Sequence, residues 1–97
     1  MVKSHKETPV DPMIVAPRLT ALREALGLSK AEFSDMIEID RSSYTKIEKG
    51  EKPLLPRQAY KIYERFGVDM NYIYLGQVGG VPQRLSKALT ANLSTLH

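Results

Sequence analysis

Apolar residues recur along this chain at the spacing of a helix face. In each of five stretches between residues 17 and 76, leucine, isoleucine, methionine or aromatic residues stand mostly three or four positions apart, which is typical of helices with one buried side. No stretch alternates apolar and polar residues as a half-buried strand does. The pattern predicts an all-α fold. Its apolar positions are Leu19, Leu22 and Leu26; Phe33, Met36 and Ile37; Tyr44 and Ile47; Ala59, Ile62, Tyr63 and Phe66; and Met70, Ile73, Tyr74 and Leu75.

Residues that start and stop helices stand between these stretches. Ser29 followed by Glu32 is a capping-box pattern at the start of the second helix, and Asp40 is the expected N-cap of the third. Glycine and proline mark other boundaries in the same way. The remaining expected boundaries are Pro17 and Gly27 for the first helix, Gly50 for the end of the third, Pro56 and Gly67 for the fourth, and Asp69 and Gly76 for the fifth.

The helical period slips between the second and third stretches, at residues 38–40. Two helices separated by only three residues cannot run on in one line, so Glu38-Ile39-Asp40 is expected to form a tight turn. Ile39 is the apolar residue of this turn and is expected to point into the core. Two short helices joined in this way form a helix-turn-helix unit.

The two ends of the chain lack the pattern of its middle. Residues 1–16 hold Pro9 and Pro12 without a steady apolar period and are expected to be a flexible N-terminal arm, so that residues 17–76 form the domain. Residues 77–97 start with a flexible Gly79-Gly80 pair and then place leucines at positions 85, 89, 93 and 96. Because a lone helix of about 12 to 15 residues is marginal in water, this C-terminal tail is expected to be either disordered or an amphipathic dimerisation helix.

Composition narrows the class of protein further. The 97 residues suit one small domain, and the lack of cysteine excludes disulfides and thiolate metal sites and fits a reducing cytoplasm. No apolar run approaches the roughly 20 residues of a membrane span, and residues 1–13 lack the apolar region of a secretory signal. We therefore expect a cytoplasmic protein without a membrane partner.

The sequence offers no arrangement of catalytic residues. His5 and His97 lie in opposite tails, and no glycine-rich phosphate loop is present. Helix capping and solvation explain the acidic cluster of Asp35, Glu38 and Asp40 better than paired-carboxylate catalysis does. The expected protein is not an enzyme and has no cofactor and no metal.

The charge changes sign at the start of the third helix. The chain carries a net charge of +3, but residues 19–40 carry −3 and residues 41–65 carry +4. On a helical wheel, Tyr44 and Ile47 mark the buried side of the third helix, and the opposite side is made of hydrogen-bond donors and cations. Such a face can enter a DNA major groove, although a simple solvated face is the plainer alternative. Its members are Arg41 at the N-terminal edge and Ser42, Thr45, Lys46 and Lys49.

Residues Arg18 to Gly76, "RLTALREALGLSKAEFSDMIEIDRSSYTKIEKGEKPLLPRQAYKIYERFGVDMNYIYLG", resemble the helix-turn-helix domain of the Cro/phage-repressor (XRE-like) type. The most specific parts are "LREALGLSKAEF", "YTKIEKG" and "FGVDMNYIYLG". The resemblance implies a compact five-helix bundle of the lambda-repressor-like type. Such bundles usually bind double-stranded operator DNA as a two-fold homodimer, with the second helix of the motif, about residues 41–49 here, in the major groove.

The resemblance also implies roles for individual residues. An ion pair is expected between Arg23 and Glu48, joining the first helix to the recognition helix. The expected DNA-binding residues are Arg41, Ser42 and Lys46 for bases; Ser43 and Thr45 at the edges; and Lys30, Lys49 and Lys52 for the backbone.

Three residues depart from the family pattern. Glu38 replaces a glycine in the turn, where a left-handed backbone costs another residue about 1 kcal/mol, so this turn is expected to differ in detail. Ser34 replaces a small alanine. Tyr44 replaces an aliphatic residue; we expect a core aromatic with a hydrated tip rather than a phosphate contact.

The sequence thus predicts a sequence-specific DNA-binding transcriptional regulator, prokaryotic or from a phage. The alternative is a protein-interaction module, such as an antitoxin or adaptor, that uses the same fold to hold a protein partner. The apolar stripe of the C-terminal tail is the feature that favours this alternative.

Overall fold

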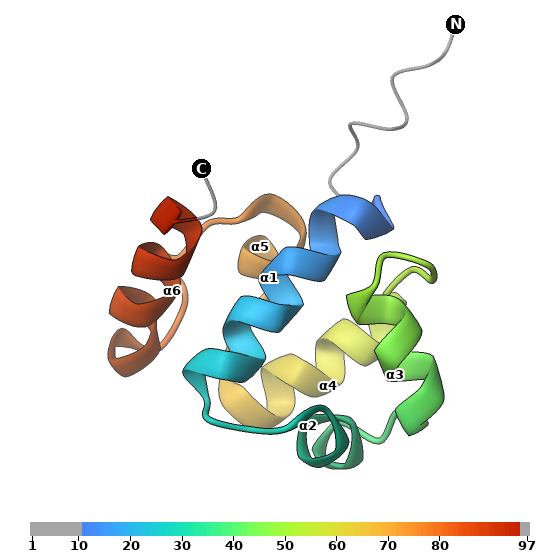
Figure 1. Ribbon diagram of the computed structural model, residues 1–97. Helices are drawn as coiled ribbons and strands as arrows, with labels where there is room; N and C mark the ends of the chain where they lie inside the picture. The colour runs from blue at the N-terminus through green and yellow to red at the C-terminus, as the bar shows by residue number, and fades with distance from the viewer. Residues whose placement is uncertain (1–10, 96–97) are drawn as a thin grey trace, which may run out of the picture.

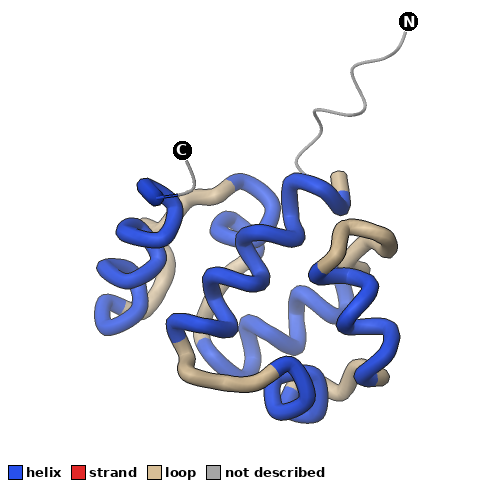
Figure 2. Tube along the Cα trace, viewed as in Figure 1, coloured by secondary structure: helices blue, strands red, loops and turns tan. Residues whose placement is uncertain are grey.

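The computed structural model describes the backbone of residues 11–95 and the side chains of residues 11–89. Within that range the chain forms six helices and no strand, which confirms the predicted all-α class. Figure 2 colours the helices blue and the connecting loops tan. Figure 1 shows how the helices surround the central α1. The helices are α1 (Pro12–Ala25), α2 (Lys30–Met36), α3 (Arg41–Glu48), α4 (Pro56–Phe66), α5 (Met70–Leu75) and α6 (Gln83–Thr95).

The first helix begins earlier than the sequence predicted. Asp11 is its N-cap and accepts a hydrogen bond from the backbone N–H of Met13 at 2.8 Å, and Pro17 lies inside the helix rather than at its start. Val15 is buried and extends the Leu19 face by one turn. The expectation of an arm up to residue 16 is therefore wrong for residues 12–16, and residues 1–10 lie outside the described part of the chain.

Local capping fixes the other helix ends where they were expected. The Ser29 side chain and the Glu32 side chain cap each other's backbone N–H groups, so the predicted capping box is confirmed. Asp69 caps α5 by accepting from the backbone N–H of Tyr72 at 3.3 Å. Each helix then needs only its packed face to be stable.

The core is built around Phe33 of α2. Its ring lies 5.3 Å from that of Tyr44 in α3 and stacks at 5.4 Å on that of Phe66 in α4, so one aromatic side chain joins three helices. Leu19 and Leu22 of α1 are fully buried in the same cluster. The inner faces of the helices are thereby fixed relative to one another.

Helix α6 packs on α1, on the side away from α3 (Figure 1). Leu85 is 5% exposed and Leu89 is fully buried, and both belong to the same core as α1. The predicted amphipathic helix is present, and Leu85 and Leu89 of its apolar stripe are buried in the core of the same chain, so residues 83–89 are ordered. The side chains of Leu93 and Leu96 lie outside the described residues.

The turn between α2 and α3 keeps a left-handed backbone despite its glutamate. Glu38 has φ 61°, and its N–H donates to the carbonyl of Asp35 at 3.2 Å, while Ile39 N–H donates to the carbonyl of Ser34 at 2.9 Å. This is the Schellman arrangement, which favours glycine at the position of Glu38. The expectation of a different turn is therefore wrong, and Ile39 points into the core as predicted, 7% exposed.

Candidate nucleic-acid interface

Helix α3 begins directly after the turn because Asp40 caps it. The Asp40 carboxylate accepts from the backbone N–H of Ser43 at 3.1 Å and from the hydroxyl of Ser42 at 2.9 Å. These hydrogen bonds, that of Ser43 first, lower the pKa of Asp40, because they favour the ionised form. The cap fixes which residues of α3 face the core and which face solvent.

The two faces of α3 differ completely. Tyr44 and Ile47 are buried, at 0% and 2% exposure. The outward face carries hydroxyls and cations, and the segment after α3 adds two more cations, Lys49 and Lys52. Arg41, Ser42, Lys46, Lys49 and Lys52 are exposed, and Ser43 and Thr45 are half-buried.

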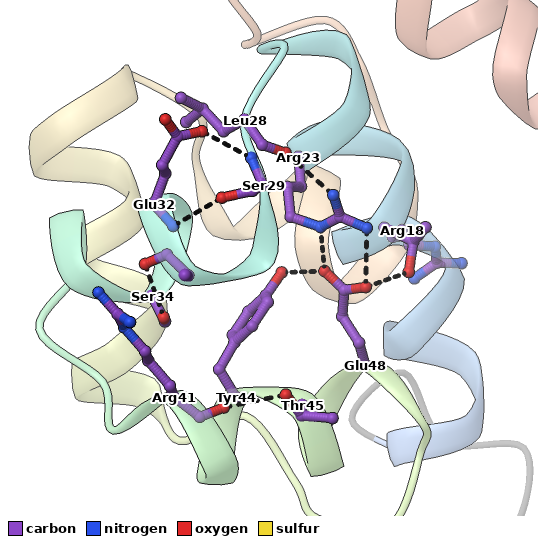
Figure 3. A network of polar contacts seen from close by, with 12 residues as sticks. Arg18, Arg23, Leu28, Ser29, Glu32, Ser34, Arg41, Tyr44, Thr45 and Glu48 are labelled. Atoms are coloured by element: carbon purple, nitrogen blue, oxygen red, sulfur yellow. Dashed lines mark hydrogen bonds and ion pairs between the residues drawn. The ribbon is translucent and has the colours of Figure 1, made fainter.

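Some of these side chains are held by one another. The Thr45 hydroxyl donates to the carbonyl of Arg41 at 3.0 Å (Figure 3), and Lys52 Nζ donates to the Ser43 hydroxyl at 3.2 Å. The second contact places Lys52 beside the first turn of α3. Among the described side chains no hydrogen bond or ion pair occupies Lys46 or Lys49, so their ammonium groups stay open to solvent.

Lys30, the eighth predicted contact residue, stands at the first position of α2 and is exposed. No polar contact joins it to α3 among the described residues. The structure thus brings the seven other predicted residues together on α3 and the loop after it, and it leaves Lys30 on the neighbouring helix.

A groove of about 550 Å³ runs between the turn, α3 and the start of α4. Three cationic side chains line it, from Lys52, Arg57 and Lys61, against two acidic ones, from Glu38 and Asp40. Lys61 Nζ lies 3.2 Å from Oε1 of Glu38, so it is Arg57 that extends the basic surface from α3 onto α4. Arg57 and Lys61 both belong to the positively charged segment 41–65, but neither was predicted as an interface residue.

Arg41 is paired with a residue that the sequence analysis did not assign. Its Nε lies 3.0 Å from Oδ1 of Asp35, and its Nη2 lies 2.6 Å from Oδ2. The two residues therefore form a bidentate ion pair across the turn. The hydrogen bonds from Arg41 lower the pKa of Asp35. The sequence signal that could have predicted this ion pair is the presence of opposite charges six positions apart, on either side of the turn.

A second ion pair fixes the other end of α3. Arg23 of α1 meets Glu48 with Nε to Oε2 at 2.7 Å and Nη2 to Oε1 at 3.3 Å (Figure 3). Thr20 donates to Oε1 at 3.0 Å, and the Tyr44 hydroxyl donates to Oε2. This is the expected pair, and at 13% and 4% side-chain exposure it is largely, though not completely, buried. The hydroxyls of Thr20 and Tyr44 complete a network that the sequence analysis missed.

Titration of this network follows from its burial and hydrogen bonds. Burial favours the neutral acid of Glu48, but the hydrogen bonds from Arg23, Tyr44 and Thr20 outweigh it and lower the pKa of Glu48. Burial, and then the neighbouring Glu48, raises the pKa of Tyr44. Tyr44 is thus a core aromatic whose hydroxyl is used inside the protein rather than at a phosphate.

Two short helices, a four-residue turn (residues 37–40) in which Ile39 is buried, and an outward basic second helix define a helix-turn-helix protein. A family model described as a helix-turn-helix domain matches residues 16–77, and the chain belongs to this family, which is of the XRE/Cro type. Comparisons with curated proteins and with solved structures give no match. The matched range covers α1 from Ala16 through α5 and leaves α6 outside.

Neither a membrane-spanning helix nor a cluster of metal-ligating side chains is found among the described residues. None of their helices is both long enough and apolar enough to cross a membrane. They also contain no group of three histidine, aspartate or glutamate side chains placed to hold a metal ion.

Proposed function

We propose that this chain is a cytoplasmic transcriptional regulator of the repressor type that binds double-stranded DNA by placing α3 in the major groove. The observation that carries the proposal is the contrast between the faces of α3: a locked apolar side and an exposed side of donors and cations. A major groove admits one helix, and it presents acceptors to arginine and lysine. Binding is the whole activity proposed, without a cofactor or an enzymatic step.

The contacts of α3 divide into two kinds. Arg41, Ser42 and Lys46 are proposed to meet base edges, since they are the exposed residues of the N-terminal and middle turns. Phosphates are proposed to be met by residues at the edges and in the flanking segments, since such contacts fix register without reading sequence. These residues are Lys30, Ser43, Thr45, Lys49 and Lys52.

We further propose that two copies bind a dyad-symmetric site, with half-sites about 34 Å apart. One recognition helix contacts few base pairs, and pairing half-sites is the usual route to specificity. With Leu85 and Leu89 buried on α1, helix α5 is the remaining candidate for the dimer contact, and its Leu75 is 48% exposed. Sedimentation of the full chain with and without duplex tests this, and Leu75→Glu is the variant expected to leave only monomers.

Selection of duplexes from a random pool tests the proposal, followed by a salt titration of binding. The wild-type chain is expected to enrich one motif, and its affinity for random duplex is expected to fall steeply with salt. Lys46→Ala should relax preference at particular base pairs. Lys49→Ala should weaken all duplexes alike and reduce the salt slope by about 1. Binding that is indifferent to salt and to sequence would overturn the proposal.

A protein-binding module remains the second candidate, for a reason other than the tail. Tyr60 and Tyr63 on α4 are 52% and 49% exposed, and their ring centroids lie 6.1 Å apart. Aromatic side chains are enriched where proteins meet. This candidate predicts no enrichment of duplexes.

A further inference from the structure

The pair of Arg41 and Asp35 stands at the edge of the proposed reading face. Asp35 lies in the last turn of α2, and Arg41 is the first residue of α3. Their side chains are 55% and 66% exposed, so both remain accessible to a ligand. An ion pair this exposed contributes little to folding, because water and salt screen it. Its geometry is therefore of more interest than its contribution to stability.

The carboxylate occupies one particular edge of the guanidinium group. Asp35 accepts from Nε and from Nη2 of Arg41. A guanidinium has five N–H donors in a flat, rigid fork. Three of them stay available: both on Nη1 and one on Nη2. Nη1 and Nη2 each present one of these along the far edge of the fork, side by side.

A guanine base offers two hydrogen-bond acceptors that match two parallel donors. Its O6 and N7 face the major groove and accept two hydrogen bonds from one arginine guanidinium in a bidentate contact. Because Asp35 holds the near edge, the plane and direction of the fork are set before DNA arrives. Less side-chain freedom is then lost on binding, and the far edge is aimed as a unit.

The Asp35 carboxylate also weakens the attraction of Arg41 to DNA phosphates. Paired with Asp35, the guanidinium carries little net charge toward phosphates, and an uncovered carboxylate at this place is repelled by them. The pair therefore gives up affinity for DNA in general and keeps the donors suited to one base. Specificity is a difference between affinities, and weakening the wrong contacts raises it.

We propose that Asp35 is a positioning residue that holds Arg41 for bidentate recognition of a guanine in the major groove. This inference rests on the proposed function, since it names how the reading face of α3 discriminates. It predicts opposite changes in two quantities when Asp35 is removed: preference for that guanine falls, and affinity for random duplex rises. A merely structural role for Asp35 would move both in the same direction or neither.

The test uses the full chain and duplexes selected by the wild type, with binding measured by fluorescence anisotropy. Replacing each guanine in turn by 7-deazaguanine removes the N7 acceptor. One replacement is expected to weaken the wild type by about fivefold or more, and to affect Arg41→Ala hardly at all. Asp35→Ala and the isosteric Asp35→Asn are expected to lose most of that discrimination while binding random duplex more tightly.

Glu51→Gln is the matched control, because it removes one exposed negative charge close after α3 without touching Arg41. It should change affinity for random duplex and leave the 7-deazaguanine effect intact. If Asp35→Ala keeps full discrimination at the position read by Arg41, this inference is overturned while DNA binding stands. A wild type that selects no duplex would overturn the proposed function, and this inference with it.

Discussion

Two bidentate ion pairs join helix α3 to its neighbours, and they differ in solvent exposure. At its C-terminal end, Glu48 and Arg23 are 4% and 13% exposed. At its N-terminal end, Arg41 and Asp35 are 66% and 55% exposed. Burial decides what each pair does: removal of one partner from the first strands a buried charge, whereas removal from the second returns the other to water.

The comparison assigns different tasks to the two ends of one helix. The buried pair, with the hydroxyls of Thr20 and Tyr44, sets how α3 lies on α1. The exposed pair arranges donors for a ligand. Changes at the first pair should therefore alter folding, and changes at the second should alter recognition.

Breaking the buried pair is expected to have the largest effect. Arg23→Ala or Glu48→Ala should each destabilise the fold by about 3–5 kcal/mol, because the remaining charge loses its partner inside the protein. Denaturant unfolding measures this, with Asp35→Ala as the exposed counterpart that should unfold like the wild type. Arg23→Met combined with Glu48→Leu should recover much of the loss. Single losses that simply add in a double-mutant cycle would contradict the contact.

Helix α6 extends the structural side of the comparison to the far side of α1. Leu89→Ala removes a fully buried side chain and should lower the free energy of unfolding by about 2–5 kcal/mol. The ratio of affinities for selected and random duplex should not change. Lys87→Ala, at an exposed position of the same helix, is the control and should leave both the free energy of unfolding and this affinity ratio unchanged. An unchanged unfolding midpoint for Leu89→Ala would place α6 outside the core.

Tyr44→Phe removes one donor from the buried pair and keeps its charges. The hydroxyl is bound to a carboxylate, so the loss should be about 1.5–3 kcal/mol in denaturant unfolding. Tyr74→Phe is the matched control, because the Tyr74 hydroxyl donates to the neutral carbonyl of Leu54 at 3.0 Å and is expected to contribute only about 0.5–1.5 kcal/mol. Equal losses from both would show that Glu48 gains nothing from Tyr44.

Acid should weaken the buried pair. Since the folded protein holds the pKa of Glu48 below its usual value, the resulting stability is fully present above the unfolded pKa of about 4.3. It is lost as the pH falls below that value through the folded pKa. Unfolding free energy measured from pH 6 to pH 3 should decline less steeply in Glu48→Gln than in the wild type. Parallel curves would contradict the assignment.

The turn that separates Asp35 from Arg41 provides the smallest expected change. Glu38→Gly relieves a left-handed residue and should stabilise the fold by up to about 1 kcal/mol. It also removes the exposed ion pair of Glu38 with Lys61 at 3.2 Å, which offsets part of the gain. Glu38→Ala loses the same ion pair without the relief, so the difference between the two variants measures the backbone contribution. A glycine variant no more stable than the alanine variant would contradict this account.

The sequence predicted those parts of the fold that depend on neighbouring residues. Ser29, Asp40 and Asp69 cap helices with their own side chains, so position alone indicated where α2, α3 and α5 begin. Pro17 was misleading because proline suits a helix start, yet at an exposed position near the N-terminus a helix tolerates the loss of one hydrogen bond.

Contacts between helices were predicted less completely. The resemblance to a family supplied Arg23 with Glu48, but Thr20 and Asp35 depend on the angle at which helices cross, which periodicity does not encode. The burial of Leu85 and Leu89 had the same origin: an amphipathic stripe indicates that a helix is covered, and packing decides by what. Here α1 of the same chain covers it.

The central claim is that the outward face of α3 meets DNA while its inward face and α6 hold the fold. Backbone amide chemical shifts of the isotope-labelled full chain, titrated with a duplex selected from a random pool, test this most directly. We expect the largest changes at residues 41–49, with Lys30 and Lys52, and very small ones along residues 83–89. Large changes on α4 and α6 with the signals of α3 unmoved would contradict the account.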